Sequence, residues 1–164
     1  MNILIEELLG GLPDATESAR MVIRLLAAMI LGAIIGYQRE RAGKSAGLRT
    51  HMLVAMGCAL FVLAGSSAGM STEGLSRVIQ GIATGIGFIG AGTILKREEQ
   101  REIEGLTTAA GIWMTAAAGV AAGLGRLGLA LLSVILTWVI LALLGFLSAR
   151  IAKKCPISTD GQKE

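Results

Sequence analysis

The chain has 164 residues, of which 53% are hydrophobic and only 16% are charged. Soluble domains carry about 25% charged residues, so this composition excludes an ordinary soluble protein and predicts an all-α, polytopic membrane protein built as one bundle. The net charge is +3, and the basic residues are distributed unevenly along the chain. This distribution is more informative about the membrane topology than the net charge.

The N-terminal residues 1–19 are polar and acidic, and they contain Pro13 after two glycines. A secretory signal begins with basic residues that lead into an apolar core, and this segment does neither. We therefore expect a short lead-in at the membrane surface. A transmembrane domain is predicted over residues 20–150, followed by a basic, polar and disordered cytoplasmic tail over residues 151–164.

Five apolar segments of the transmembrane domain are predicted to be membrane-spanning helices. They are residues 21–37, 51–69, 78–95, 106–124 and 129–149. Cys58 lies in the second span and Cys155 in the basic tail, so the two thiols are expected at different depths and no disulfide is predicted.

The connections between the spans carry most of the positive charge. The loop 38–50, the loop 96–105 and the tail from Arg150 hold eleven of the 15 Lys and Arg residues. The opposite side of the membrane receives only Arg20, Arg24, Arg77 and Arg126. Short cytoplasmic loops collect Lys and Arg, so the N-terminus is predicted outside and the C-terminus in the cytoplasm.

The third span contains a glycine-rich stretch, GIATGIGFIGAGTIL at residues 81–95, which carries no charge. In a bilayer the backbone must bond to itself, so such a helix survives and its glycines become contact surface. We expect this stretch to be the central helix, with the other spans packed around it. The glycines expected at helix contacts are Gly32, Gly36, Gly81, Gly85, Gly87, Gly90 and Gly92.

The first four spans contain an internal repeat. Residues 32–65 align without gaps onto residues 90–123, at an offset of 58, with 12 identities in 34 positions. An Arg-Glu pair recurs where one helix ends, and Gly-Leu-x-Thr recurs where the next begins. We therefore predict two helical hairpins of the same orientation, related by an axis along the membrane normal, with the fifth span outside the repeat.

Little in the spans indicates chemistry. They contain no Asp or Glu away from their ends, although a magnesium or proton pathway normally uses an intramembrane carboxylate. The lone histidine, His51, has no partner at metal-ligand spacing and is expected to be an interfacial cap. No residue set typical of nucleophilic or metal-dependent catalysis occurs, so we predict no enzymatic activity, no metal site and no cofactor.

Gly47-Leu48-x-Thr50 and Gly105-Leu106-x-Thr108 each open a helix on the predicted cytoplasmic side. Unpaired N–H groups and the positive dipole at a helix start favour anions. If the hairpins pack by their repeat symmetry, these helix starts converge on a pocket for a phosphate or a lipid headgroup. The alternative is that the threonines only cap helices and the arginines bind the inner leaflet without specificity. The pocket would be formed by Arg39, Arg49, Thr50, Arg97, Thr107 and Thr108.

Four stretches of the chain resemble the MgtC/SapB family of bacterial inner-membrane proteins. They are LLAAMILGAIIGYQRE (25–40), AGLRTHMLVAMG (46–57), GIGFIGAG (85–92) and GLTTAAGIW (105–113). The resemblance implies a five-helix membrane domain, here in a short form without the soluble C-terminal domain of the virulence-linked members. Those members have Asn where Thr107 and His51 stand in this chain.

The resemblance also implies a link to growth at low magnesium, to acid or envelope stress and to intracellular survival. Some members act by binding other membrane proteins, including the membrane sector of ATP synthase. The expected partners are therefore membrane lipids, other inner-membrane proteins and a second copy of the chain, with no role for nucleic acid.

Two functions remain open on the sequence. The first is a non-enzymatic regulatory membrane protein that docks glycine-faced helices or cytoplasmic loops onto partners. The second is a transporter or channel for an ion or small solute. A transport path needs Gln80, Thr84, Thr93 and Thr115 to line a hydrated cavity, whereas docking needs exposed faces that are small and apolar.

Overall fold

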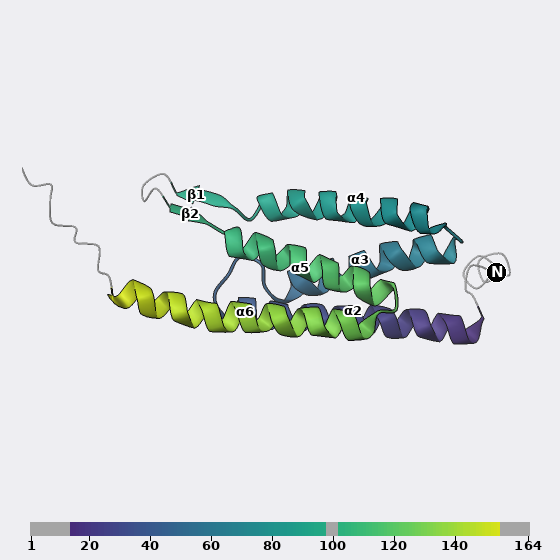
Figure 1. Ribbon diagram of the computed structural model, residues 1–164, viewed down its shortest axis with the longest axis horizontal. Helices are drawn as coiled ribbons and strands as arrows, with labels where there is room; N and C mark the ends of the chain where they lie inside the picture. The colour runs from purple at the N-terminus through teal and green to yellow at the C-terminus, as the bar shows by residue number, and fades with distance from the viewer. Residues whose placement is uncertain (1–13, 98–101, 155–164) are drawn as a thin grey trace, which may run out of the picture.

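The protein is described by a computed structural model that covers residues 14–97 and 102–154, with the side chains of residues 95–102 and 144–154 outside the description. Five helices make up this part of the chain, which confirms the predicted all-α class (Figure 1). They are α2 (Ala15–Arg41), α3 (Leu48–Ser67), α4 (Thr72–Ala91), α5 (Leu106–Gly123) and α6 (Leu127–Lys154).

Several helices begin earlier or end later than the sequence predicted. Helix α4 starts at Thr72 because the Ser71 hydroxyl accepts a hydrogen bond from the Gly74 N–H at 3.2 Å, and the Arg77–Glu73 ion pair supports its polar first turns. Helix α6 runs to Lys154, into the segment predicted to be a disordered tail. The lead-in was predicted over residues 1–19. Its residues 1–13 lie outside the described part of the chain, and its residues 15–19 belong to α2.

The predicted loop 96–105 contains a short antiparallel ribbon. Strand β1 (Leu95–Arg97) pairs with strand β2 (Glu102–Glu104), with Leu95 opposite Glu104. The composition of this charged segment indicated only a loop and did not predict that its two halves pair as strands. Gly105 then turns the chain into α5 with a φ of +97° and passes so close to the Thr93 carbonyl that a side chain has no room.

Consecutive helices run in opposite directions along one axis (Figure 1). The connection after α2, the β-ribbon and the end of α6 therefore lie at one end of the bundle. The start of α2 and the turns after α3 and α5 lie at the other end. Three of the described helices, α2, α3 and α5, are long and apolar enough to cross a membrane, and α6 contributes a shorter apolar stretch at Leu127–Leu143.

The tightest packing joins α3 to both α2 and α5, and these two helices also contact each other. A Cβ atom at Gly32 would lie 2.5 Å from the His51 carbonyl oxygen, and one at Gly36 would lie 2.7 Å from the Leu48 Cα. From α5, Gly119 meets the backbone of Ala55 and Gly123 meets that of Ala59. Small residues on both partners thus let three helices approach to backbone distance.

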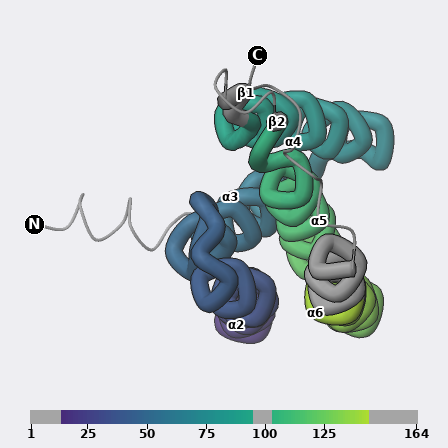
Figure 2. The backbone as a smooth tube through the Cα atoms, turned by 90° about the vertical axis from the view of Figure 1, so that its left-hand side faces the viewer, coloured from purple at the N-terminus to yellow at the C-terminus, as the bar shows by residue number. Residues whose placement is uncertain are grey.

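The prediction that the glycine-rich third span is the central helix is wrong. Helix α4 packs on α5 at the side of the bundle, and of its residues only Ile86 and Gly90 are buried (Figure 2). No atom lies within 4 Å of a Cβ placed at Gly81, Gly85 or Gly87. Gly90 touches Ala109 at ordinary contact distance.

The other glycine predicted on this helix, Gly92, is its C-cap and meets only carbonyls of the helix's own last turn. Gly81, Gly85 and Gly87 of α4 face no neighbouring helix within 4 Å, whereas Gly119 and Gly123 face Ala55 and Ala59 on α3. A glycine therefore marks a helix contact only where the backbone of a neighbouring helix passes at the same height.

The internal repeat corresponds to a structural one. Helices α2 and α4 run in the same direction, as do α3 and α5. Gly32 of α2 contacts His51 of α3, and Gly90 of α4 contacts Ala109 of α5. Gly90 is 58 positions after Gly32, and Ala109 is 58 positions after His51. The repeat therefore preserves a contact between helices as well as residue identities.

Candidate buried polar site between helices α2, α3 and α5

Arg39 lies in the last turn of α2 and points into the bundle. Its Nη2 donates a hydrogen bond of 2.9 Å to the Oγ1 of Thr108 in the first turn of α5. Only 5% of Arg39 and 2% of Thr108 is exposed, so the contact is buried. The Nε atom of the same guanidinium is also buried and has no hydrogen-bond partner. Arg39 is therefore a cation inside the protein whose one hydrogen-bond partner among the described residues, Thr108, is neutral.

His51 of α3 and Thr115 form a second buried contact, farther along α5. The His51 Nδ1 and Thr115 Oγ1 atoms are 2.7 Å apart, and both residues have no exposed surface. The Thr115 hydroxyl also lies 2.9 Å from the Gly111 carbonyl oxygen, to which it donates. In that arrangement the His51 Nδ1 carries the proton and donates it to Thr115, because a hydroxyl has a single hydrogen.

The prediction that His51 is an interfacial cap is therefore wrong. Gly111 of α5 leaves room for the ring, because its Cβ position lies 3.7 Å from the His51 Cε1, whereas Gly32 and Gly36 of α2 lie against the backbone carbonyl and the Cβ of His51. A polar side chain in an apolar core needs a hydrogen-bond partner, and Thr115 supplies one. The signal available in the sequence was a lone histidine and a lone threonine in apolar spans, without any indication that they face each other.

The start of α3 is neutralised by an acid. The Glu40 carboxylate accepts a 2.7 Å hydrogen bond from the Leu48 N–H, the first residue of α3. Helix α5 begins after Gly105, which offers no side chain to cap it. The positive end of α5 and the Arg39 cation therefore lie together at this end of the bundle.

The predicted anion pocket is only partly assembled. Arg39 and Thr108 meet, but Arg49 and Thr107 are exposed and Thr50 is half-buried, with no described contact to Arg39. The side chain of Arg97 lies outside the described residues. What the structure brings together is a small, buried pair rather than an open ring of arginines and threonines.

The residues proposed to line a transport path do not share a cavity in the described part of the chain. The Thr84 and Thr93 hydroxyls donate to carbonyls of their own helix, at Gln80 and Gly90. Gln80 and Thr84 are exposed on α4, and Thr115 is buried against His51. No three described His, Cys, Asp or Glu side chains lie close enough together to hold a metal ion.

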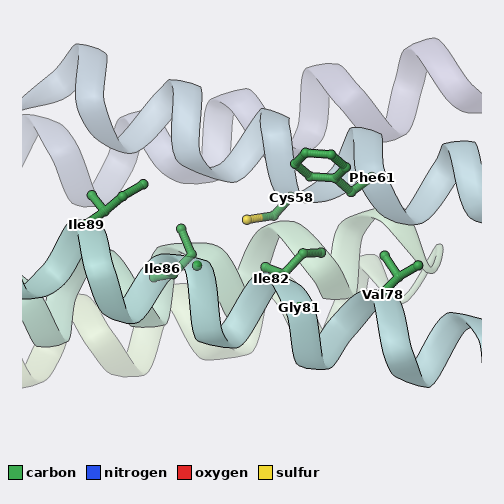
Figure 3. A pocket seen from close by; sticks show the side chains of 8 residues that line it. Cys58, Phe61, Val78, Gly81, Ile82, Ile86 and Ile89 are labelled. Atoms are coloured by element: carbon green, nitrogen blue, oxygen red, sulfur yellow. The ribbon is translucent and has the colours of Figure 1, made fainter.

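A cavity of about 470 Å³ opens between α3 and α4. Figure 3 shows Cys58 and Phe61 of α3 facing Val78 and Ile82 of α4 across it. Gly81 and Gly85 belong to the same wall, and every lining side chain is apolar apart from the thiol. Phe61 is 65% exposed, so this cavity is a groove on the side of the bundle.

The apolar spans, the glycine-mediated helix contacts and the five antiparallel helices define an integral membrane protein. The model of the MgtC family matches residues 25–150, so the chain belongs to that family. This confirms the resemblance found in the sequence. No solved structure matches the chain.

Three relatives illustrate the similarity. Protein SrpB of Synechococcus elongatus is 48% identical over 134 residues, which cover 75% of this chain and 72% of SrpB. Protein MgtC of Salmonella typhimurium is 43% identical over 142 residues, 87% of this chain and 59% of MgtC. The putative magnesium transporter YhiD of Escherichia coli is 42% identical over 144 residues, 84% of this chain and 66% of YhiD. The chain thus matches less than two thirds of the last two relatives.

Proposed function

We propose that this protein is a non-enzymatic regulatory protein of the bacterial inner membrane that binds transmembrane helices of partner proteins along α4. The observation that carries the proposal is the set of unfilled glycine positions on α4, where Gly81 and Gly85 share the face toward the groove and Gly87 lies on a different face. Gly81, Gly85 and Gly87 have no neighbour within 4 Å, whereas the glycines of α2 and α5 are in close contact with α3. Small, unfilled helix faces are the surfaces by which membrane helices associate.

The groove between α3 and α4 supports the same function. Its apolar walls and its place on the side of the bundle suit a helix that arrives through the lipid. The names of two relatives, MgtC and the putative magnesium transporter YhiD, support a physiological role linked to magnesium. The regulated partner is then a membrane protein whose activity matters when magnesium is scarce.

A transporter is the second candidate, because YhiD carries that description and because His51 and Arg39 place polar groups inside the bundle. Liposomes that contain the purified protein distinguish the two functions. We expect no flux of Mg²⁺, H⁺ or phosphate above that of empty liposomes. A saturable flux that is lost in His51→Leu would identify a transporter instead.

The docking function predicts a large effect for Gly85→Leu. The added side chain has room in the isolated protein but occupies the groove, so the fold is retained and the partner is displaced. We expect at least a tenfold loss of cysteine crosslinks between Ile82→Cys and a partner helix in membranes, together with loss of growth at low magnesium. Protein level and melting temperature should stay the same.

The matched control is Gly128→Leu. Gly128 is also an exposed helical glycine with nothing within 4 Å, but it lies on α6, away from the groove. The Gly128→Leu variant should form as many Ile82→Cys crosslinks as the parent protein and should support the same growth at low magnesium. Equal loss in both variants would mean that leucine on any exposed face is harmful, and the α4 surface would have no special role.

We further propose that the end of the bundle with the connection after α2 and the β-ribbon faces the cytoplasm. Two of the three basic segments in the prediction lie there, along with the end of α6. Cysteines introduced at Ser45 and Thr72 test this, since both residues are exposed and they lie at opposite ends. In intact cells an impermeant thiol reagent should label the cysteine at position 72 and spare that at 45. The reverse pattern would invert the topology.

A further inference from the structure

We infer that Arg39 and the first turn of α5 form a binding site for one phosphate-type oxyanion, either free phosphate or the headgroup phosphate of a lipid. This site is separate from the α4 groove and does not depend on the proposed docking function. It lies at the end of the bundle where α2 finishes and α5 begins.

The first argument is the unbalanced charge. A buried ion is stable only when it is paired and hydrogen-bonded, because its loss of hydration is costly. Arg39 is 95% shielded from solvent, yet the single ion pair among the described side chains joins Arg77 to Glu73. Glu40, its neighbour in the sequence, turns away to bind the Leu48 N–H. An anion is the missing partner.

The second argument is the free polar atoms. The Nε and Nη2 atoms form one edge of the guanidinium, the edge that holds two oxygens of a phosphate or carboxylate. Nη2 is bonded to Thr108, and Nε is buried without a partner. The site therefore contains a buried N–H donor for which no hydrogen-bond partner is found.

The Thr108 hydroxyl adds a second donor. Four other described threonines, Thr84, Thr93, Thr115 and Thr137, donate to a carbonyl three or four residues earlier in their own helix. Thr108 instead accepts a hydrogen bond from Arg39, and no acceptor for its own hydrogen is found in the described part of the chain. An oxyanion oxygen beside the Arg39 Nε can accept that hydrogen as well.

The third argument is the start of α5. This helix has 18 residues, and its N-cap Gly105 supplies no side-chain hydrogen bond to the first N–H groups, which form the positive end of the helix dipole. The start of α3 carries the Glu40 carboxylate in the corresponding position. One helix start thus has an internal anion, and the other has a cation beside it. An external anion relieves both unfavourable charges at once.

Anion-dependent thermal unfolding of the full chain in a neutral maltoside detergent tests the inference. Free phosphate is titrated against chloride at equal ionic strength, and phosphatidylglycerol is titrated against oleate, an anionic lipid without phosphate. We expect stabilisation by phosphatidylglycerol over oleate, by phosphate over chloride, or by both. Stabilisation by the lipid alone identifies the headgroup as the source, and stabilisation by both identifies the phosphate group itself.

Three variants locate the site. Arg39→Gln should weaken the apparent affinity for the stabilising anion by at least tenfold, and Thr108→Val should weaken it by about threefold to tenfold. Arg49→Gln removes an exposed arginine near the same end and should change the affinity by less than twofold. If Arg39→Gln does not fold, Thr108→Val decides, because it keeps the cation and the shape of the side chain. Equal losses in all three variants, or no preference of the parent protein for phosphate, would overturn the inference.

Discussion

Replacing Gly119 with alanine is expected to destabilise the protein by about 3 kcal/mol, since overpacking a tight core costs roughly 1–3 kcal/mol and the added atom here meets backbone. The new Cβ would fall on the Ala55 carbonyl, a group that cannot move without shifting α3. That helix is also in close contact with α2, where the Cβ position of Gly32 lies 2.5 Å from the His51 carbonyl oxygen. A shift of α3 that relieves the clash at position 119 would therefore disturb a second tight contact.

Thermal unfolding in detergent should show this as a fall in melting temperature of about 6–12 °C, by the usual scaling for a chain of this size. The control is Gly87→Ala. Gly87 is also a helical glycine, but nothing lies within 4 Å of its Cβ position. Alanine should stabilise α4 there by up to about 1 kcal/mol through helix propensity alone. Effects of the same sign at both positions would contradict the packing described for α3 and α5.

The second large effect is expected for Thr115→Val, which should destabilise the protein by about 2 kcal/mol because it leaves a buried ring nitrogen of His51 without a partner. Valine keeps the shape of threonine, so no cavity forms. The exposed fraction of both residues is 0%, and water cannot replace the hydroxyl unless the bundle opens.

Thr137→Val is the matched control. Thr137 is also buried and also donates to a carbonyl four residues earlier, at Ser133, but it has no described side-chain partner. Removing the Thr137 hydroxyl should lower the free energy of unfolding by no more than about 0.5 kcal/mol. In the double variant His51→Leu/Thr115→Val, the loss of unfolding free energy should be about 1 kcal/mol smaller than the sum of the losses in the two single variants. The reason is that removing both partners leaves no buried polar group unpaired. Strict additivity would show that the 2.7 Å contact contributes nothing.

Much of the architecture could be predicted from local features. Length, low charge and five apolar segments indicated a helical membrane bundle. The positions of Lys and Arg indicated which connections share one end. The repeat at an offset of 58 residues indicated two hairpins of equal orientation, and its register holds in the contacts of Gly32 and Gly90. These are properties of single helices and of their order in the chain, so the sequence contains them directly.

Only the tertiary structure decided which helix is surrounded and which polar groups meet. The glycines of α2, α4 and α5 look alike in the sequence, but only glycines of α2 and α5 meet the backbone of α3, and α4 is left at the side. Arg39 and Thr108 are 69 positions apart, and His51 and Thr115 are 64 apart. Whether such residues meet depends on the rotation of each helix about its own axis. That rotation is fixed by the summed packing of every side chain at the interface, which no local pattern encodes.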